Sequence, residues 1–304
     1  MLDQVTGMRV FVRVAAAGSL AAAGRSLGLS QTMVTKHVDA TEVRLGVRLL
    51  HRSTRRLTLT EAGRGYLEAC QRILAEIEEA DEAAAAGQAE PRGLLRLNAP
   101  VSFGTSQVAP LLGQFAASYP KVRLDVGLND RVVDLIEEGW DLAIRIGVPR
   151  DSSLVSRRLA PCRMVVCASP GYLRAHGTPR TLADLGGHNC LGYTLSERMG
   201  TSRWSFGGDA DVVAPVSGTM QANNGDALRE AALAGLGVIY QPTFLVGSDI
   251  RSGALVALAL DHPPALAGYI QAVFRPDRML PLKSRVMIDF LAGRFGDEPP
   301  WDRG

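Results

Sequence analysis

Apolar side chains recur at intervals of three and four residues through the first 45 positions of the chain, which is the period of an amphipathic helix. The spacing predicts a first helix that ends at Gly18, a second that begins after Ser19 and a third that begins after Ser30. The two serine hydroxyls can accept hydrogen bonds from the unpaired amides of a first helical turn, and Gly28 can adopt the left-handed conformation of a tight turn. The second and third helices, joined by this turn, predict a helix-turn-helix.

The third predicted helix has an apolar side and a polar side. Its expected inward residues are Val34, Val38, Thr41 and Leu45, and its expected outward residues are Gln31, Thr32, Thr35, Lys36 and Asp39. A short polar surface at the N-terminal end of a helix can enter the major groove of DNA and meet the base edges. Gln31 can bind an adenine edge through two hydrogen bonds, and Thr32 or Thr35 can contact a thymine methyl or a phosphate. The alternative interpretation is an ordinary solvated helix face.

Residues 49–59 contain two alternating runs of apolar and polar residues around a short polar turn, which predicts a β-hairpin. Three arginines lie at or near its tip, where they suit phosphates or a narrow minor groove, and its leucines are expected to pack on the helices. Helices and hairpin together predict a winged helix-turn-helix over residues 1–65. The residues predicted to contact DNA are Ser30, Gln31, Thr32, Thr35, Lys36, Arg52, Arg55 and Arg56.

A long helix is predicted from Glu61 to Gly87, with Thr60 as its cap. Its apolar positions form a heptad-like seam flanked by glutamates, and the seam residues are Leu67, Cys70, Leu74, Ile77 and Ala84, with Asp81 as a break. Because a lone helix cannot bury such a seam, we expect it to pair with a second copy of the chain. The alternative is that it packs on the chain's own later domain. The stretch 87–93, rich in Gly and Pro, reads as a linker.

From Leu94 onward, short apolar runs alternate with helical patterns, and this rhythm predicts a mostly parallel α/β sheet covered by helices. The first series comprises strands at 94–99, 122–126 and 142–146 and helices at 105–118 and 132–138. The second comprises strands at 164–168, 238–240, 255–258 and 269–274 and helices at 227–234 and 282–295. Residues 296–304 are expected to be loose. Two α/β lobes, between which the chain crosses, predict a ligand cleft.

Ligands of such folds bind outside the carboxyl ends of the strands. Polar residues gather there, together with one aromatic, and the set is Ser102, Phe103, Thr105, Asn129, Asp130, Asn223 and Asn224. The first three lead into a helix, whose unpaired amides favour an anion or a carboxylate. Each residue taken singly is typical of a cap or a turn. Together they predict an effector site, and its chemistry favours a small organic acid or an aromatic compound.

Charge and composition narrow the function class. The chain has a net charge of +2, but residues 1–65 contain ten Lys and Arg against four Asp and Glu, so the front is +6 and the remainder −4. A basic front fits a polyanion-binding module. Arg13 and Asp3 argue against a secretory signal, and the sequence has no long uncharged apolar run, so we expect a soluble cytoplasmic protein without a membrane span.

Signals for catalysis and for metal binding are weak. The four cysteines have no metal-ligand spacing and are expected to be buried thiols, with Cys162 beside Arg163 as the one weak redox candidate. The five histidines are scattered, and the sequence has no nucleophile elbow and no phosphate loop. We therefore predict no cofactor and no metal. The competing hypothesis makes the rear half an enzyme or a solute carrier, since its fold class also supports catalysis.

Two groups of motifs resemble the LysR-type transcriptional regulators. The front group runs from Ala22-Ala23 through Ser30-Gln31 to Glu42, Leu45-Gly46, Arg52 and Leu59-Thr-Glu-Ala-Gly63; the rear group is Tyr119-Pro120, Asp141-Leu-Ala-Ile-Arg145 and Gly235-Leu-Gly-Val-Ile-Tyr-Gln-Pro242. Thr32 stands where the family usually has proline, Thr35 where it has serine, Thr41 where it has leucine and Leu50 where it has phenylalanine. These departures leave DNA binding expected and the operator sequence open.

The resemblance implies an α+β multidomain protein: a winged helix-turn-helix at 1–65, a linker and dimerisation helix at 61–87, and a two-lobed, periplasmic-binding-protein-like effector domain at 88–304. It implies a homodimer or a tetramer of dimers on an interrupted palindrome of double-stranded DNA, with RNA polymerase as a further partner. Arg145 and Thr201 complete the predicted effector set. The predicted function is sequence-specific transcription regulation, controlled by a small molecule in the cleft and without enzymatic activity.

Overall fold

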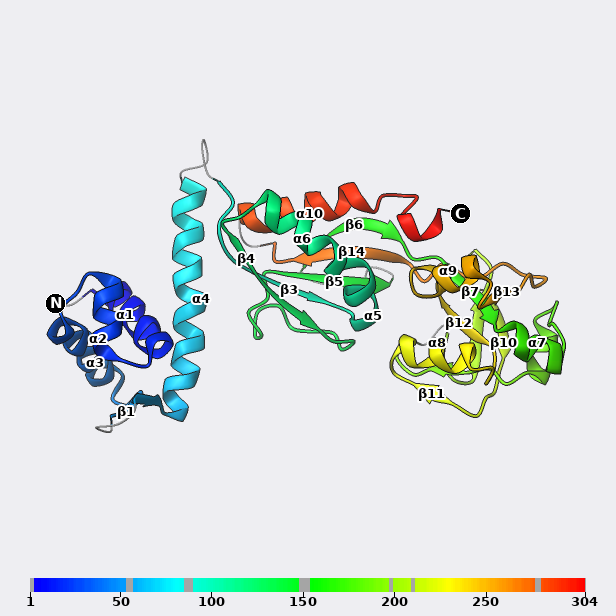
Figure 1. The fold of residues 1–304 in the computed structure, drawn as a ribbon, viewed down its shortest axis with the longest axis horizontal. Coiled ribbons are helices and arrows are strands. Elements are labelled where there is room, and N and C mark those ends of the chain that lie inside the picture. The colour runs from blue at the N-terminus through cyan, green and yellow to red at the C-terminus, as the bar shows by residue number, and fades with distance from the viewer. Residues whose placement is uncertain are drawn as a thin grey trace. The chain divides into compact units, whose positions relative to one another are not determined.

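A computed structural model describes residues 3–52, 57–84, 90–147, 154–196, 199–208, 211–276 and 280–303. The chain forms two compact units, Met1–Ala89 and Glu90–Gly304, and each is described by itself (Figure 1). The predicted winged module and the predicted linker helix therefore fall within one compact unit. Among the residues so described, no helix is long and apolar enough to cross a membrane.

The first unit is a three-helix cluster with a hairpin and a long helix. Its elements are α1 (Gln4–Ala17), α2 (Leu20–Leu27), α3 (Gln31–Leu45), β1 (Leu50–Arg52), β2 (Leu57–Leu59) and α4 (Glu61–Ala84). Gly18 and Gly28 end α1 and α2 in the left-handed conformation, with φ of 60° and 68°, as predicted. β1 and β2 pair antiparallel, which confirms the hairpin, although its tip at residues 53–56 lies outside the described residues.

The core of the first unit corrects two sequence expectations. Val34 and Val38 are fully buried, as predicted, but Leu45 is 36% exposed because Gly46 ends α3 there and the chain turns away. On α4, Cys70 is fully buried and Leu74 is 9% exposed, and both belong to the core that α1 and α3 build around Phe11. The early part of the predicted dimer seam is thus used within the chain itself.

The second unit begins with a lobe built on a five-stranded sheet. Its elements are β3 (Gly93–Ala99), α5 (Val101–Phe103), a π-helical turn (Gly104–Val108), α6 (Ala109–Ser118), β4 (Val122–Leu128), β5 (Leu142–Gly147), β6 (Val155–Pro161), β14 (Tyr269–Phe274) and α10 (Leu282–Arg294). The strand order is β4-β3-β5-β14-β6. β3 pairs parallel with β4 and β5, but β14 runs antiparallel to both of its neighbours. The prediction of a mostly parallel sheet is correct only for the first three strands.

The other lobe, residues 162–268, consists of smaller sheets and helices. Its elements are β7 (Met164–Ala168), α7 (Pro170–His176), a 3-10 helix (Ala183–Gly187), β8 (Gly192–Tyr193), β9 (Arg203–Phe206), β10 (Val212–Pro215), β11 (Gln221–Ala222), α8 (Gly225–Leu233), β12 (Ile239–Pro242), α9 (Thr243–Ser252) and β13 (Val256–Ala257). β12 and β13 flank β7 antiparallel. The predicted bounds of β7 and β14 are confirmed, whereas β6, α7, α9 and the β9–β10 hairpin were not foreseen.

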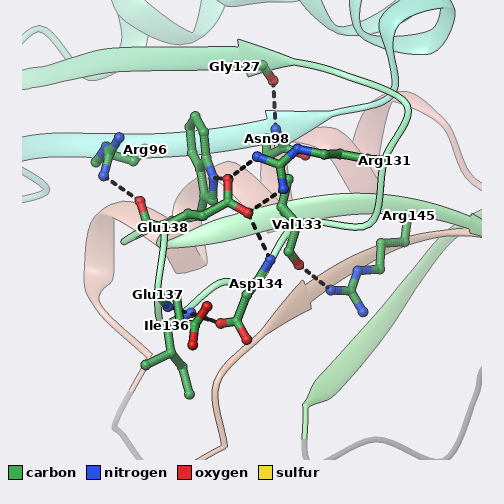
Figure 2. A network of polar contacts seen from close by, with 11 residues as sticks. Arg96, Asn98, Gly127, Arg131, Val133, Asp134, Ile136, Glu137, Glu138 and Arg145 are labelled. Atoms are coloured by element: carbon green, nitrogen blue, oxygen red, sulfur yellow. Dashed lines mark hydrogen bonds and ion pairs between the residues drawn. The ribbon is translucent and has the colours of Figure 1, made fainter.

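The helix predicted at 132–138 is wrong, because two carboxylates take the backbone amides that a helix would use (Figure 2). Asp134 Oδ1 accepts from the amides of Ile136 and Glu137 at 2.8 and 3.0 Å, and Glu138 Oε1 accepts from the Asp134 amide at 3.1 Å. Arg131 holds both oxygens of Glu138 at 2.6 Å. Such local side-chain bonds compete with helix formation, and the segment becomes a hydrogen-bonded loop.

The tail was expected to be loose, and this prediction is also wrong. Residues Pro300–Asp302 form a 3-10 turn that buries Trp301 to 6% exposure. The indole packs against Phe103 of one lobe and Phe244 of the other, with ring centroids 5.7 and 6.3 Å apart. Asp302 pairs with Arg163. The tail is ordered because it completes an aromatic cluster where the two lobes meet.

Candidate DNA-contact face and effector site

The turn between α2 and α3 presents the start of α3 to solvent. The Ser30 hydroxyl accepts from the Met33 amide at 3.2 Å, which confirms it as the cap. Gly24 allows α2 to pack closely against the turn that follows it. A Cβ at this position would lie 2.7 Å from the Leu29 carbonyl oxygen, which is closer than side chains approach backbone atoms. Sequence reasoning did not single out Gly24, although a glycine inside a helical pattern is a signal of close backbone packing.

The predicted DNA-contacting residues of α3 lie where the sequence placed them. Ser30, Gln31, Thr32 and Lys36 are exposed. Thr35 is half-buried, and its hydroxyl donates to the Gln31 carbonyl at 3.0 Å. The side chain of Arg52, and Arg55 and Arg56 altogether, lie outside the described residues. The described part of the outward face is therefore short and polar, and Lys36 gives it a positive charge.

Glu42 is a residue of this module whose role sequence reasoning missed. Its side chain is 4% exposed and sits on the inner side of α3. Oε1 accepts from the amides of Leu49 and Leu50 at 2.8 and 3.1 Å, and Oε2 accepts from Arg48 at 2.7 Å. An acidic residue among the inward positions of an amphipathic helix was the available signal, because a buried carboxylate needs partners.

The start of α4 is bonded to the same segment. Thr60 caps α4, as predicted, by accepting from the Gly63 amide at 2.9 Å, and its hydroxyl donates to the Arg48 carbonyl at 2.8 Å. One turn later, Tyr66 packs on Phe11 with ring centroids 5.4 Å apart, and its hydroxyl accepts from Arg44 at 3.0 Å. Helix α3, the hairpin and α4 are thus joined by hydrogen bonds as well as by a common core.

In the second unit, the predicted effector residues meet at the start of the helical run that follows β3. Ser102 donates to Asp226 Oδ2, on α8 of the other lobe, at 2.6 Å. Asp130 Oδ1 accepts from the Val101 amide at 2.9 Å. Gln107 donates to the Phe244 carbonyl at 3.0 Å, which makes a second link between the lobes. We call these contacts of residues 101–107 with α8 and α9 the lobe junction.

The remaining predicted effector residues differ in their burial and in their hydrogen-bond partners. Asn129 is half-buried, and its Oδ1 has no hydrogen-bond partner among the described residues. Asn224 caps α8 by accepting from the Ala227 amide at 3.1 Å, and Thr105 and Asn223 are exposed. Arg145 donates to the Val133 carbonyl at 2.9 Å, beside the loop that carries Asp134 (Figure 2).

Phe103 is a correction to the predicted effector set. Its ring is fully buried, and it lies edge-on to Phe244, Phe295 and Trp301 at centroid distances of 5.1, 5.7 and 5.7 Å. No surface of the ring is open to a ligand in this structure. A phenylalanine after a strand end predicts a ligand contact, but the helical run turns this side chain inward, toward Phe244 of the other lobe.

A pocket of about 270 Å³ lies in the second lobe and contains the predicted residue Thr201. Its wall is lined by Tyr193, Thr194, Ser196, Gly200, Thr201, Ser202, Arg203 and Gln221. Burial, and next the charge of Asp130 from the first lobe, raise the pKa of Tyr193 to about 12. The pocket thus offers hydroxyl groups and one guanidinium to a small molecule.

Among the described residues, the cysteines and the metal-binding side chains form no further site. All four cysteines are buried, as expected, and burial raises the pKa of Cys162, Cys167 and Cys190 to about 12 each. Arg163 is engaged by Asp302 and does not activate Cys162. In the part of the chain that the structure describes, no group of three His, Cys, Asp or Glu side chains could hold a metal ion.

Family models match the chain in two places. The model described as a bacterial regulatory helix-turn-helix protein of the lysR family matches residues 5–64, and the one described as the LysR substrate binding domain matches residues 88–296. A transcriptional regulator of HTH type from Xanthomonas campestris pv. campestris is 40% identical over 304 residues, with 97% of this chain and 86% of its own length covered. The regulator CrgA of Neisseria meningitidis is 35% identical over 290 residues, with 95% and 96% covered.

Solved structures agree with these matches. The structure of CrgA, described as a LysR-type transcriptional regulator, superposes with a TM-score of 0.62 at 34% identity, over 96% of this chain and 99% of that one. The full-length structure of AphB, a virulence activator of Vibrio cholerae, superposes with a TM-score of 0.57 at 26% identity, again over 96% and 99%.

Proposed function

Because the chain belongs to the LysR family of DNA-binding transcriptional regulators, which are not enzymes and whose second domain binds an effector, we propose that α3 reads an operator and that the lobe junction takes the effector. The observation that carries the first part is the exposed start of α3. Gln31, Thr32 and Lys36 face solvent, while Val34 and Val38 anchor the opposite side. A rigid helix with a short polar face fits a major groove.

The reading role of α3 is tested on an operator selected from random DNA by the full-length protein. Gln31→Ala should lower affinity by about 1–3 kcal/mol at one base pair and relax the preference there. Arg55→Ala should weaken binding on every sequence alike, because a phosphate contact carries no base information. Gln4→Ala, an exposed glutamine at the start of α1, is the matched control. If Gln31→Ala and Arg55→Ala each lose the same affinity on all DNA sequences, Gln31 does not read a base in the major groove.

For the effector, we propose a small molecule that engages Ser102 and the pocket of Thr201 and thereby changes how the lobes meet. The pocket volume of about 270 Å³ suits a metabolite-sized ligand, and its hydroxyls and Arg203 suit a polar one. A thermal-shift screen of organic acids and aromatic compounds tests this site. A compound that stabilises the parent but not Ser102→Ala or Thr201→Val would support it, whereas equal shifts in all three proteins would place the ligand elsewhere.

We further propose that the regulator acts in the cytoplasm as a homo-oligomer, a homodimer or a tetramer of dimers, on an interrupted palindrome, where it contacts RNA polymerase. Symmetric pairing places two reading helices in successive grooves of such a site. Because Cys70 and Leu74 belong to the core of the first unit, we propose that self-association through α4 uses its later turns. Sedimentation of Ile77→Lys tests this placement: a parent-sized assembly would exclude Ile77 from the interface.

A further inference from the structure

We propose that Glu42 is a positioning residue for DNA binding: its buried carboxylate fixes the first strand of the wing to the recognition helix, so that α3 and the wing meet the duplex as one preformed surface. The inference rests on the proposed reading role of α3 and assigns a task to a side chain that touches no DNA. Glu42 lies on α3, eleven residues after Gln31 and on the side of the helix away from solvent.

The geometry is that of a clamp on the segment 48–50. Glu42 Oε1 accepts hydrogen bonds from the amides of Leu49 and Leu50. Both leucines are buried, at 1% and 3% exposure. The second oxygen accepts from Arg48, the residue just before them. These three donors thus come from consecutive residues at the point where the chain enters β1.

The same segment is held from the opposite side by α4. The Leu49 carbonyl accepts from the Thr60 amide at 3.0 Å, and a Cβ on Gly63 would lie only 2.0 Å from that carbonyl oxygen. Leu50 then pairs with Leu59 across the hairpin. With one side fixed by backbone contacts, the carboxylate of Glu42 is the side-chain connection that sets the wing relative to α3.

A carboxylate suits this role better than a neutral side chain. Hydrogen bonds to an ionised acceptor are shorter and stronger than neutral ones, and one carboxylate oxygen can accept two converging amides. Glutamine would keep an acceptor oxygen for the amides but would turn an N–H₂ donor toward Arg48. Alanine would leave two buried amides unpaired. Glu42→Ala should therefore loosen the attachment of the wing to α3 more than Glu42→Gln does.

A fixed wing matters because DNA binding is weaker when a loop must first be ordered. If Glu42 sets the wing, its loss should lower affinity on every sequence and reduce the number of phosphates engaged. It should leave the base preference set by Gln31 unchanged, since the start of α3 is capped by Ser30 and packed through Val34, both independent of Glu42. This division distinguishes positioning of the wing from general destabilisation of the module.

The experiment uses the full-length protein and an operator selected from random DNA by the parent. We expect Glu42→Gln to raise the Kd roughly tenfold, the loss of about one charge-assisted hydrogen bond, and to make the dependence of the Kd on salt shallower. In hydroxyl-radical footprints, protection should weaken at the sites flanking the major-groove contact, and base preference should stay that of the parent. Glu61→Gln, an exposed glutamate on the same unit, is the matched control.

Amide hydrogen exchange adds a readout that does not depend on DNA. In Glu42→Gln, the amides of Leu49 and Leu50 should exchange faster, while those in the middle of α3 should not change. If Glu42→Gln gives the footprint, Kd and exchange rates of Glu61→Gln, the inference is wrong. It is equally wrong if wing and helix protections fall together with thermal stability, because that is a purely structural role. A parent that selects no DNA at all would instead overturn the reading role of α3.

Discussion

Replacing Ser102 by alanine should loosen the contact between the two lobes of the second unit. The Ser102 hydroxyl is one of two described side-chain donors that cross from residues 101–107 to the other lobe, and its bond to Asp226 is 2.6 Å long. Ser102 is 9% exposed and Asp226 is half-buried, so solvent screens the pair only in part. A hydrogen bond to a charged group contributes about 1.5–3 kcal/mol, and the partial exposure favours the lower end, about 1.5 kcal/mol.

That energy sets two measurable effects. Since 1.4 kcal/mol is a factor of ten, the equilibrium between joined and separated lobes should shift about tenfold toward separation. The free energy of unfolding of the second unit should fall by about 1.5 kcal/mol if the two lobes unfold together. Asp226→Asn keeps an acceptor oxygen and loses the charge, so its effect should be smaller than that of Ser102→Ala.

Urea unfolding followed by tryptophan fluorescence measures the second effect, because all three tryptophans, Trp140, Trp204 and Trp301, belong to the second unit. Spin labels at Ala116→Cys and Ala175→Cys, exposed positions on α6 and α7, measure the distribution of distances between the lobes. The native cysteines are buried and do not compete for the label.

The matched control is Ser118→Ala, at the end of α6 in the first lobe. Its hydroxyl donates to the Gln114 carbonyl at 3.0 Å, within the same helix, so its loss should change neither measurement by more than a few tenths of a kcal/mol. The reasoning is refuted if Ser102→Ala and Ser118→Ala share one urea midpoint and one distance distribution, since the bond to Asp226 would then not hold the lobes together.

Three further outcomes follow from the structure. Trp301→Ala should destabilise the second unit by about 3–5 kcal/mol, visible as a lower urea midpoint at unchanged m, because the indole fills the aromatic cluster between the lobes. The hydrogen bonds from Arg131 lower the pKa of Glu138 to about 2; the bonded carboxylate therefore stabilises the fold above its ordinary pKa, and this stability is lost as pH falls toward 2, so Glu138→Gln should flatten the acid-unfolding curve in that range. Ellman's reagent should find no fast thiol in the native protein and four after unfolding, since all four cysteines are buried.

The front module was readable from the sequence because its signals are local. Ser19, Gly28 and Ser30 each act within four residues of their own position, through a cap bond or a left-handed turn. The strands β7 and β14 were readable for a similar reason, as largely apolar runs between turn residues. A local pattern of apolar residues can be recognised in the sequence without knowing which residues pack against it.

The errors arise where a distant or competing partner decides the structure. Residues 132–138 have the spacing of a helix, but the carboxylates of Asp134 and Glu138 take its amides. The antiparallel return of β14 depends on pairing with β5, more than 120 residues earlier, which no local pattern encodes. Of the effector residues, Ser102 was found from its place at a strand end, but its partner Asp226 lies 124 residues away.

The contacts at the lobe junction also bear on what an effector must do. Sequence reasoning expected the unpaired amides of a helix start to take an anion, but Asp130 already accepts from Val101, and Asn224 from Ala227. An acidic effector at Ser102 would have to displace Asp226, whereas Asn129 Oδ1 is a buried acceptor without a hydrogen-bond partner among the described residues. A ligand shifts an equilibrium only by its difference in affinity for the two states. A molecule that leaves the bond between Ser102 and Asp226 intact gains nothing from moving the lobes there, so an effector that acts through this contact must replace it.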